Sequence, residues 1–207
     1  LSGAYSVKEG TRIICDRAFY GCYSLSEIVI PSSVTSIGDS AFSGCRSLSE
    51  IVIPSSVTSI GDRAFEDCSS LKYISIPKSV ICLNGNPFAE WNGKLECLSP
   101  NFVYEDDILF NKDKSRIISF RNQNIESYVI PSSVTSIGDR AFWNCRSLSE
   151  IVIPSSVTSI GKGAFSGCSS LIDIVIPNSV TSIGKDAFYG CRSLSEIVIP
   201  SSVTSIG

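Results

Sequence analysis

The sequence predicts a β-rich solenoid, a stack of about eight short coils that each contain two strands and a helical turn. Three observations predict it. A 23-residue unit recurs along almost the whole chain, and SEIVIPSSVTSIG appears unchanged at 26–38, 49–61, 149–161 and 195–207. The apolar residues of each unit occupy fixed columns. A unit of this length is too small to bury its own apolar face, whereas stacked copies can cover one another.

The first element of each unit is a short strand. In the second copy of the repeated segment, Ile51 and Ile53 are expected to face the core. Glu50 and Val52 alternate with them and are expected to face outward, which is the period of a half-buried strand. Pro54 then ends the strand, because proline has no N–H to donate to a sheet.

A second short strand and a turn complete the unit. The second strand is expected at 57–60, and Gly61 is expected to take a positive φ at the corner that follows. Ala64, Phe65 and Cys68 are expected to form a short helical turn that points the phenyl ring and the thiol inward. These positions recur as two columns. The aromatic column consists of Phe19, Phe42, Phe65, Phe88, Phe142, Phe165 and Phe188, and the thiol column of Cys22, Cys45, Cys68, Cys145, Cys168 and Cys191.

The thiol column is expected to be structural. The chain has 9 cysteines but no CxxC pair. Thiols spaced by 23 residues lie on neighbouring coils, about 5 Å apart and pointing the same way. A metal needs ligands that converge on one point, and a disulfide needs a different orientation of the two side chains. We therefore expect small buried thiols, with no metal site and no cofactor. The three cysteines outside the column are not explained by this pattern.

The phase of the repeat is lost in the middle of the chain. Between Pro100 and Pro131 there are eight residues more than one unit requires. Two apolar segments, 107–110 and 116–120, flank the polar segment 111–115, which predicts a β-hairpin. Because the phase resumes without a linker, residues 1–207 are expected to form one domain. It contains repeats at 7–98, an irregular repeat at 99–129 and repeats at 130–207.

The pattern LxxIxIPxSVTxIGxxAFxxCxS closely resembles the BspA-like, or Treponema-type, leucine-rich repeat, from about Val7 to Gly207. This resemblance implies a right-handed leucine-rich-repeat solenoid. It also implies a segment of a bacterial or protist surface protein. The stretch SPNFVYEDDILFNKDKSRIISF resembles an insert that recurs in this family.

Several functional classes are excluded by what the sequence lacks. There is no histidine, so no Ser-His-Asp or Cys-His catalytic arrangement can form. No Walker A, GxGxxG or GxSxG motif is present, and the protein is not expected to be an enzyme. A net charge of −3 is unsuited to nucleic acid or anionic lipid. No apolar run approaches the ~18 residues of a membrane span.

The outward side of the first strands is the main candidate for partner binding. Its first column reads Glu27, Glu50, Tyr73, Glu96, Ser127, Glu150, Asp173 and Glu196. A column that is mostly valine runs beside it, as expected for protein recognition. The alternative is a solubility role, in which water and the arginine four residues earlier neutralise each carboxylate (Arg46, Arg146, Arg192).

Aromatic residues that interrupt the repeat form a second set of candidates, because exposed aromatic side chains often supply binding energy. They are Tyr73, Trp91, Tyr104, Phe110 and Tyr128. Asn111, Asp113 and Ser115 have the alternate spacing of a calcium loop. The glycine and the distal glutamate of that loop are missing, so a solvated turn is expected. A single threonine column falls short of the two ranks of an ice-binding face.

The sequence therefore predicts a monomeric, non-catalytic module that recognises a host matrix protein or another cell-surface protein. Two alternatives remain: a structural stalk that presents another domain, and an intracellular interaction scaffold. The chain starts at Leu1 without a signal-peptide pattern and stops inside a unit. We therefore expect a segment of a longer protein, exposed outside the cell or on its surface, whose export signal and anchor lie elsewhere.

Overall fold

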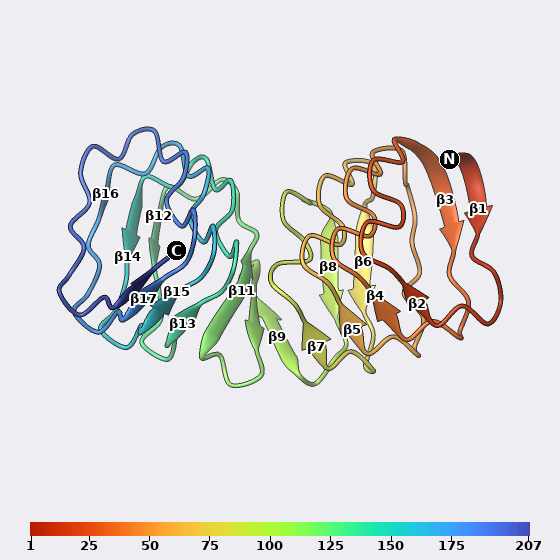
Figure 1. The fold of residues 1–207 in the computed structure, drawn as a ribbon, viewed down its shortest axis with the longest axis horizontal. Coiled ribbons are helices and arrows are strands. Elements are labelled where there is room, and N and C mark those ends of the chain that lie inside the picture. The colour runs from red at the N-terminus through yellow and green to blue at the C-terminus, as the bar shows by residue number, and fades with distance from the viewer. The chain divides into compact units, whose positions relative to one another are not determined.

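The structure is a computed structural model that describes residues 1–207. It contains strands, turns and bends but no helix, and it forms a β-solenoid of about nine turns, where the sequence predicts about eight. The chain forms two compact units, Leu1–Phe102 and Val103–Gly207 (Figure 1). The single domain expected from the sequence stays a prediction.

The first unit is built from parallel strands that lie one coil apart. The four-stranded sheet has the order β2-β4-β5-β7, and two smaller sheets pair β1 with β3 and β6 with β8. The strands are β1 (Ser2–Ser6), β2 (Ile13–Ile14), β3 (Ser24–Val29), β4 (Ser36–Ile37), β5 (Ser59–Ile60), β6 (Tyr73–Ile76), β7 (Cys82–Leu83) and β8 (Lys94–Cys97). Pairs such as Ile37 with Ile60 keep the spacing of 23 residues.

The second unit repeats this arrangement and adds the hairpin. Its two sheets have the orders β18-β17-β15-β13-β11-β10-β9 and β12-β14-β16. The strands are β9 (Phe102–Glu105), β10 (Ile108–Asn111), β11 (Arg116–Phe120), β12 (Ser127–Val129), β13 (Ser136–Ile137), β14 (Glu150–Val152), β15 (Ser159–Ile160), β16 (Asp173–Ile174), β17 (Ser182–Ile183) and β18 (Ser205–Ile206). The antiparallel pairing of β10 with β11 confirms the predicted hairpin.

The aromatic column forms the centre of each core. The rings of Phe42 and Phe65 stack with centroids 5.7 Å apart, and those of Phe142 and Phe165 stack at 5.1 Å. All four are fully buried. The predicted ladder is therefore confirmed, and stacking neighbouring coils is what removes these rings from water.

The predicted helical turn is wrong. Ala64 and Cys68 donate to carbonyls three residues earlier, as in consecutive tight turns. Arg63 and Phe65 instead donate across to the next coil, Phe65 to the carbonyl of Pro87 at 2.9 Å. Because alternate N–H groups bond between coils, they cannot also bond along a helix. Phe65 and Cys68 nevertheless point inward, as expected.

The expected role of Gly61 is also wrong. Its φ does not lie in the left-handed region, but a Cβ there would lie 2.4 Å from the backbone nitrogen of Asp39 on the preceding coil. Gly161 shows the same close approach, with Asp139. Glycine is therefore required for the close approach of two coils rather than for a special φ. The left-handed conformation falls two residues later, at Arg63 (φ 55).

Serine and threonine side chains join the coils at the corners. The Ser56 hydroxyl donates to the carbonyl of Val34 at 2.6 Å, and the Thr58 hydroxyl donates to that of Thr35 at 3.2 Å. Ser156 repeats the first bond in the second unit. The repeated Ser and Thr of the IPSSVTSIG segment therefore stabilise the stacking of the coils.

The coil that contains Trp91 is two residues shorter than the repeat. Trp91 stands 23 residues after Cys68, but Ile74 pairs with Leu95, only 21 residues later. The buried Trp91 indole N–H donates to the carbonyl of Leu71 at 2.7 Å. Gly93 is needed beside it, because a Cβ would lie 2.4 Å from the Trp91 ring. The large buried ring thus stands where a regular coil has its cysteine.

Candidate functional site

The outward face, meaning the solvent-facing residues of the first strands, carries an acidic and an apolar column in the first unit. Glu27 and Glu50 lie opposite each other in a parallel bridge, and both are exposed. Val29 and Val52, two residues further on, are 52% and 78% exposed. Like charges directly opposite each other destabilise a sheet, so this arrangement does not serve stability.

Glu96 does not continue the acidic column. The strands β6 and β8 pair Tyr73 with Lys94 and Ser75 with Glu96, which puts Glu96 in the apolar column. The prediction of its position is wrong because of the two residues missing near Trp91. The hydroxyls of Tyr73 and Ser75 both donate to the Glu96 carboxylate, and these bonds lower the pKa of Glu96. The same bond from Tyr73 is the main cause that raises the pKa of Tyr73.

Tyr73 and Ser75 line a groove of about 660 Å³ on the first unit. Val52 and Leu98 supply exposed apolar surface, and Glu50, Lys72 and Tyr73 supply polar and charged groups around it. An apolar centre with a polar rim is the common organisation of a protein-binding surface.

The second unit presents the same columns in the predicted register. The strands β12, β14 and β16 bring Ser127, Glu150 and Asp173 into one line. Glu196 is exposed in the coil that follows, outside any strand. The apolar column beside them is exposed throughout and consists of Val129, Val152, Val175 and Val198. Shallow grooves of about 500 and 400 Å³ follow these columns.

The arginines expected to neutralise the acidic column do not do so. Arg46 pairs with Asp67 on the next coil, Nη2 to Oδ2 at 2.7 Å, and not with Glu50. No ion pair joins Arg146 or Arg192 to the glutamate four residues later. No ion pair within the chain therefore neutralises the carboxylates of the outward face.

Two of the five candidate aromatic residues are not exposed. Trp91 and Phe110 are 2% and 3% exposed, so the prediction that they lie on the surface is wrong. Both fill gaps in the core where the repeat is irregular. Tyr128 is half-buried against Phe120, and burial is the main cause that raises its pKa to about 12. Only Tyr73 is well exposed on the outward face.

Tyr104 lies on β9, the strand that precedes the hairpin. The half-buried Tyr104 donates to the carboxylate of Asp107 at 2.9 Å. In the turn, the Asp113 carboxylate accepts from the hydroxyl of Ser115 at 2.7 Å and from its backbone N–H at 3.0 Å. These bonds lower the pKa of Asp113, the hydroxyl bond first. Asp113 therefore caps the turn.

The thiol column is mostly buried and forms no disulfide. All nine cysteines are free, and the side chains of Cys45, Cys68, Cys145, Cys168 and Cys191 are buried, as predicted, whereas Cys22 is partly exposed. The Cys45 thiol donates to the carbonyl of Phe19 at 3.1 Å, and the Cys191 thiol donates to that of Phe165 at 3.2 Å. Burial raises the pKa of both Cys45 and Cys191 to about 12. No group of three metal-ligating side chains converges anywhere in the chain.

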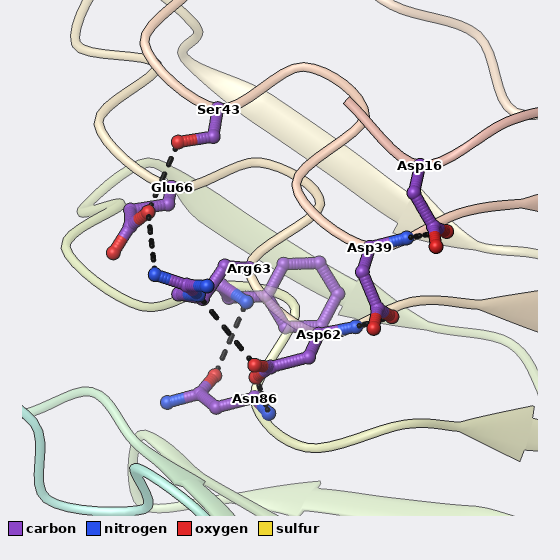
Figure 2. A network of polar contacts seen from close by, with 8 residues as sticks. Asp16, Asp39, Ser43, Asp62, Arg63, Glu66 and Asn86 are labelled. Carbon is purple, nitrogen blue, oxygen red and sulfur yellow. Dashed lines mark hydrogen bonds and ion pairs between the residues drawn. The ribbon is translucent and has the colours of Figure 1, made fainter. Parts of the chain in front are cut away.

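The side of each unit that carries the consecutive tight turns is called the turn side. On the turn side of the first unit lies a polar network that no sequence motif signals (Figure 2). The hydroxyl of Ser43 donates to the Glu66 carboxylate at 3.0 Å. Arg63 lies between Glu66 and Asp62, with nitrogen–oxygen distances of 3.9 and 3.5 Å. Its backbone N–H donates to the carbonyl of Asn86 at 3.0 Å. The network therefore joins residues of three neighbouring coils.

A ladder of aspartates runs beside the network (Figure 2). The Asp16 carboxylate accepts the backbone N–H of Asp39, and that of Asp39 accepts the N–H of Asp62, both at 2.8 Å. In the second unit Asp139 likewise accepts the N–H of Lys162, where the ladder stops because lysine cannot accept a hydrogen bond. The aspartate that follows the glycine of the repeat, at Asp39, Asp62 and Asp139, thus has a structural role.

Comparisons with known proteins agree with this architecture. The sequence profile of the BspA type Leucine rich repeat region matches residues 4–103 and 116–207. The crystal structure of the pneumococcal vaccine antigen PcpA is 27% identical, with a TM-score of 0.81 over 99% of this chain. The chain spans 58% of the length of that structure.

A leucine rich cell surface protein from Faecalibacterium prausnitzii A2-165 is 30% identical, with a TM-score of 0.69. The match covers 98% of this chain and 68% of that structure. A leucine-rich repeat protein from Eubacterium ventriosum, 22% identical, has the same fold, with a TM-score of 0.65 over 98% of this chain and 80% of that structure. No curated protein sequence gives a significant match. The structure has no helix of the length and apolar character that spanning a membrane requires.

Proposed function

Because the chain belongs to the BspA-type leucine-rich repeat family, we propose that it is a non-catalytic recognition module of a cell-surface protein, with its outward face as the binding surface. The partner is a host matrix protein or another cell-surface protein that offers basic and apolar side chains. One observation carries this proposal. An exposed valine column runs beside carboxylates that no arginine neutralises. Exposed apolar surface bordered by polar groups is a common mark of an interaction site.

The comparisons support the location outside the cell. The relative from F. prausnitzii is described as a cell surface protein, and PcpA is described as a vaccine antigen. The protein described here shares their fold and its repeat pattern.

The proposal is tested by measuring binding of the purified chain to a panel of matrix and cell-surface proteins at two salt concentrations. The first variant carries Glu50→Gln, Glu150→Gln and Glu196→Gln, which moves the net charge from −3 to −3 + 3 = 0. The control carries Glu9→Gln, Asp106→Asn and Asp186→Asn, which causes the same change of charge at exposed positions outside the outward face. Saturable binding that weakens with salt, is lost in the first variant and persists in the control supports the proposal.

A structural stalk is the second candidate, because four identical copies of a 13-residue segment leave little sequence variation for a specific site. Absence of binding to every panel member, from a chain shown to be folded and monomeric, favours the stalk. Binding that is equal in the Glu→Gln variant and the wild type moves the site away from the acidic column.

A further inference from the structure

A pocket of about 220 Å³ opens on the turn side of the second unit and shares no residue with the outward face. Its lining includes Trp143, Tyr189, Arg140, Gly163 and Ser166. Trp143, Ser166 and Tyr189 are equivalent residues of three successive coils. Neighbouring coils lie about 4.8 Å apart, so the two aromatic side chains begin about 9.6 Å apart with only a serine between them.

The absence of a side chain at Gly163 keeps this pocket, called the slot below, open. Other coils have Arg17, Ser40, Arg63 and Arg140 at this position, with the same positive φ. A Cβ at Gly163 would lie 3.2 Å from the Trp143 ring and 3.5 Å from the Arg140 side chain. Any longer side chain at this position would extend into the space beside the indole.

Two polar groups at the slot have no partner within the protein. The buried Ser166, 2% exposed, lines the pocket, and its hydroxyl makes no hydrogen bond. The equivalent Ser43 of the first unit donates to Glu66, but Tyr189 stands in place of that glutamate. The buried indole nitrogen of Trp143 also lacks a partner. The Ser166 hydroxyl, unlike that of Ser43, is therefore available to a ligand in the pocket, and it can both donate and accept.

We infer that the slot binds one ring of a neutral saccharide. Such a ring has apolar C–H faces and a rim of hydroxyl groups. The faces match the Tyr189 and Trp143 rings, and the hydroxyl groups, which both donate and accept, match Ser166. The Arg140 guanidinium lies 5.6 Å from the centre of the Trp143 ring and forms part of the same wall. Lys162 and Asp186, exposed at the pocket, supply a donor and an acceptor for further hydroxyl groups. The volume suits a single ring, and an apolar peptide side chain would leave Ser166 without a partner.

This inference goes beyond the proposed function, because the slot and the outward face are made by different residues. The chain can therefore hold a protein through one surface and a glycan through the other.

The test follows the two indole N–H resonances of the ¹⁵N-labelled chain, which contains only Trp91 and Trp143. Soluble cello-, malto-, chito- and N-acetyllactosamine oligosaccharides are titrated to tens of millimolar. At least one is expected to shift the Trp143 resonance saturably and leave that of the buried Trp91 unchanged. If no oligosaccharide shifts the Trp143 resonance, the inference is overturned.

Two variants close the slot in different ways. Gly163→Arg introduces the residue found at Arg17, Arg63 and Arg140, and Tyr189→Glu restores the partner that Ser43 has in the first unit. Each is expected to weaken saccharide binding by about tenfold or more. Gly163→Arg occupies the space of the slot, and Tyr189→Glu removes one of its aromatic rings. Tyr20→Ala, at the position of the first unit equivalent to Trp143, is the control and leaves binding unchanged. Wild-type affinity in both folded slot variants, or tighter binding of an aromatic tetrapeptide than of any saccharide, contradicts the inference.

Discussion

The turn side of the two units shows how one repeat can give a closed and an open surface. In the first unit, Ser43 is bonded to Glu66, which also faces Arg63. In the second unit, the equivalents of Ser43 and Glu66 are Ser166 and Tyr189, and no such bond forms. In the first unit these side chains bond to one another. In the second unit a pocket opens that is lined by Trp143 and Tyr189.

The difference teaches that surface chemistry can change here without a change of fold. Phe42 and Phe142 stack on their neighbours in the same way, and Gly61 and Gly161 both allow close approach of the preceding coil. The residues that fix the coil therefore point inward or lie at the corner. Residues that point outward contribute less to stability and are free to build a site.

The largest effect is expected from truncating the aromatic column. Phe65→Ala and Phe165→Ala should each lower the free energy of unfolding by about 3–5 kcal/mol, because each leaves a cavity in a fully buried stack. Urea denaturation, followed by fluorescence and circular dichroism, measures both changes. The control is Leu1→Ala, at an exposed position, and it should change the free energy of unfolding very little.

The same experiment tests whether the two units form one domain. One domain unfolds in a single transition, and either variant shifts all of it. Two transitions, with Phe65→Ala moving one and Phe165→Ala moving the other, would contradict the expectation of a single domain.

The thiol column should behave alike in both units. Burial raises the pKa of Cys45 and of Cys191 from 9.0 to about 12. Iodoacetamide at pH 8 should therefore alkylate the exposed Cys15 and Cys82 long before these two, as read by mass spectrometry. The folded state keeps these thiols protonated, whereas the unfolded chain ionises them above about pH 9. Their contribution to stability is thus present below pH 9 and lost as the pH rises toward 12. Equal alkylation rates for exposed and buried cysteines would refute this.

The short coil of the first unit offers a sharper contrast, since the second unit has no counterpart of Trp91. Gly93→Ala should destabilise the chain by about 1–3 kcal/mol, because the new Cβ collides with the Trp91 ring. In a Trp91→Phe background the smaller ring should remove part of this cost, so the two changes are not additive. Strictly additive effects in denaturant titrations would show that the collision is not the cause.

The smallest effect is expected along the aspartate ladder. Asp39→Ala should cost about 1 kcal/mol, because the backbone N–H of Asp62 loses its acceptor. Asp39→Asn keeps a carbonyl oxygen and should cost less than half of that. Lys162→Ala in the second unit, where the ladder has ended, should change the melting temperature very little. A larger loss of stability in Lys162→Ala than in Asp39→Ala would contradict this expectation.

Much of the fold could be predicted because the repeat is so regular. A period of 23 residues gives the coil, and the alternation around Ile51 gives the buried face of the first strand. The hairpin could be predicted from two apolar segments around a polar turn. The turn conformation could not, because it depends on where the N–H of Phe65 bonds, and its acceptor is Pro87 on the next coil.

The candidate site was less predictable. The acidic and valine columns follow from alternation alone, but the register near Glu96 depends on how Trp91 packs. The slot beside Trp143 could have been suspected from Gly163, which is the only glycine in its column. Its walls nevertheless become visible only when residues of three coils are placed side by side.

The sequence by itself determined the coil, its core columns and the outward columns, because these depend on the 23-residue period and on the alternation within each unit, and both can be read along the chain. Only the tertiary structure decided the register around Trp91, the reason for Gly61 and the open slot at Gly163. Each of these depends on a distance between atoms of different coils. Such distances are set by how side chains pack and which backbone groups pair across coils, and the order of residues within one unit does not contain them.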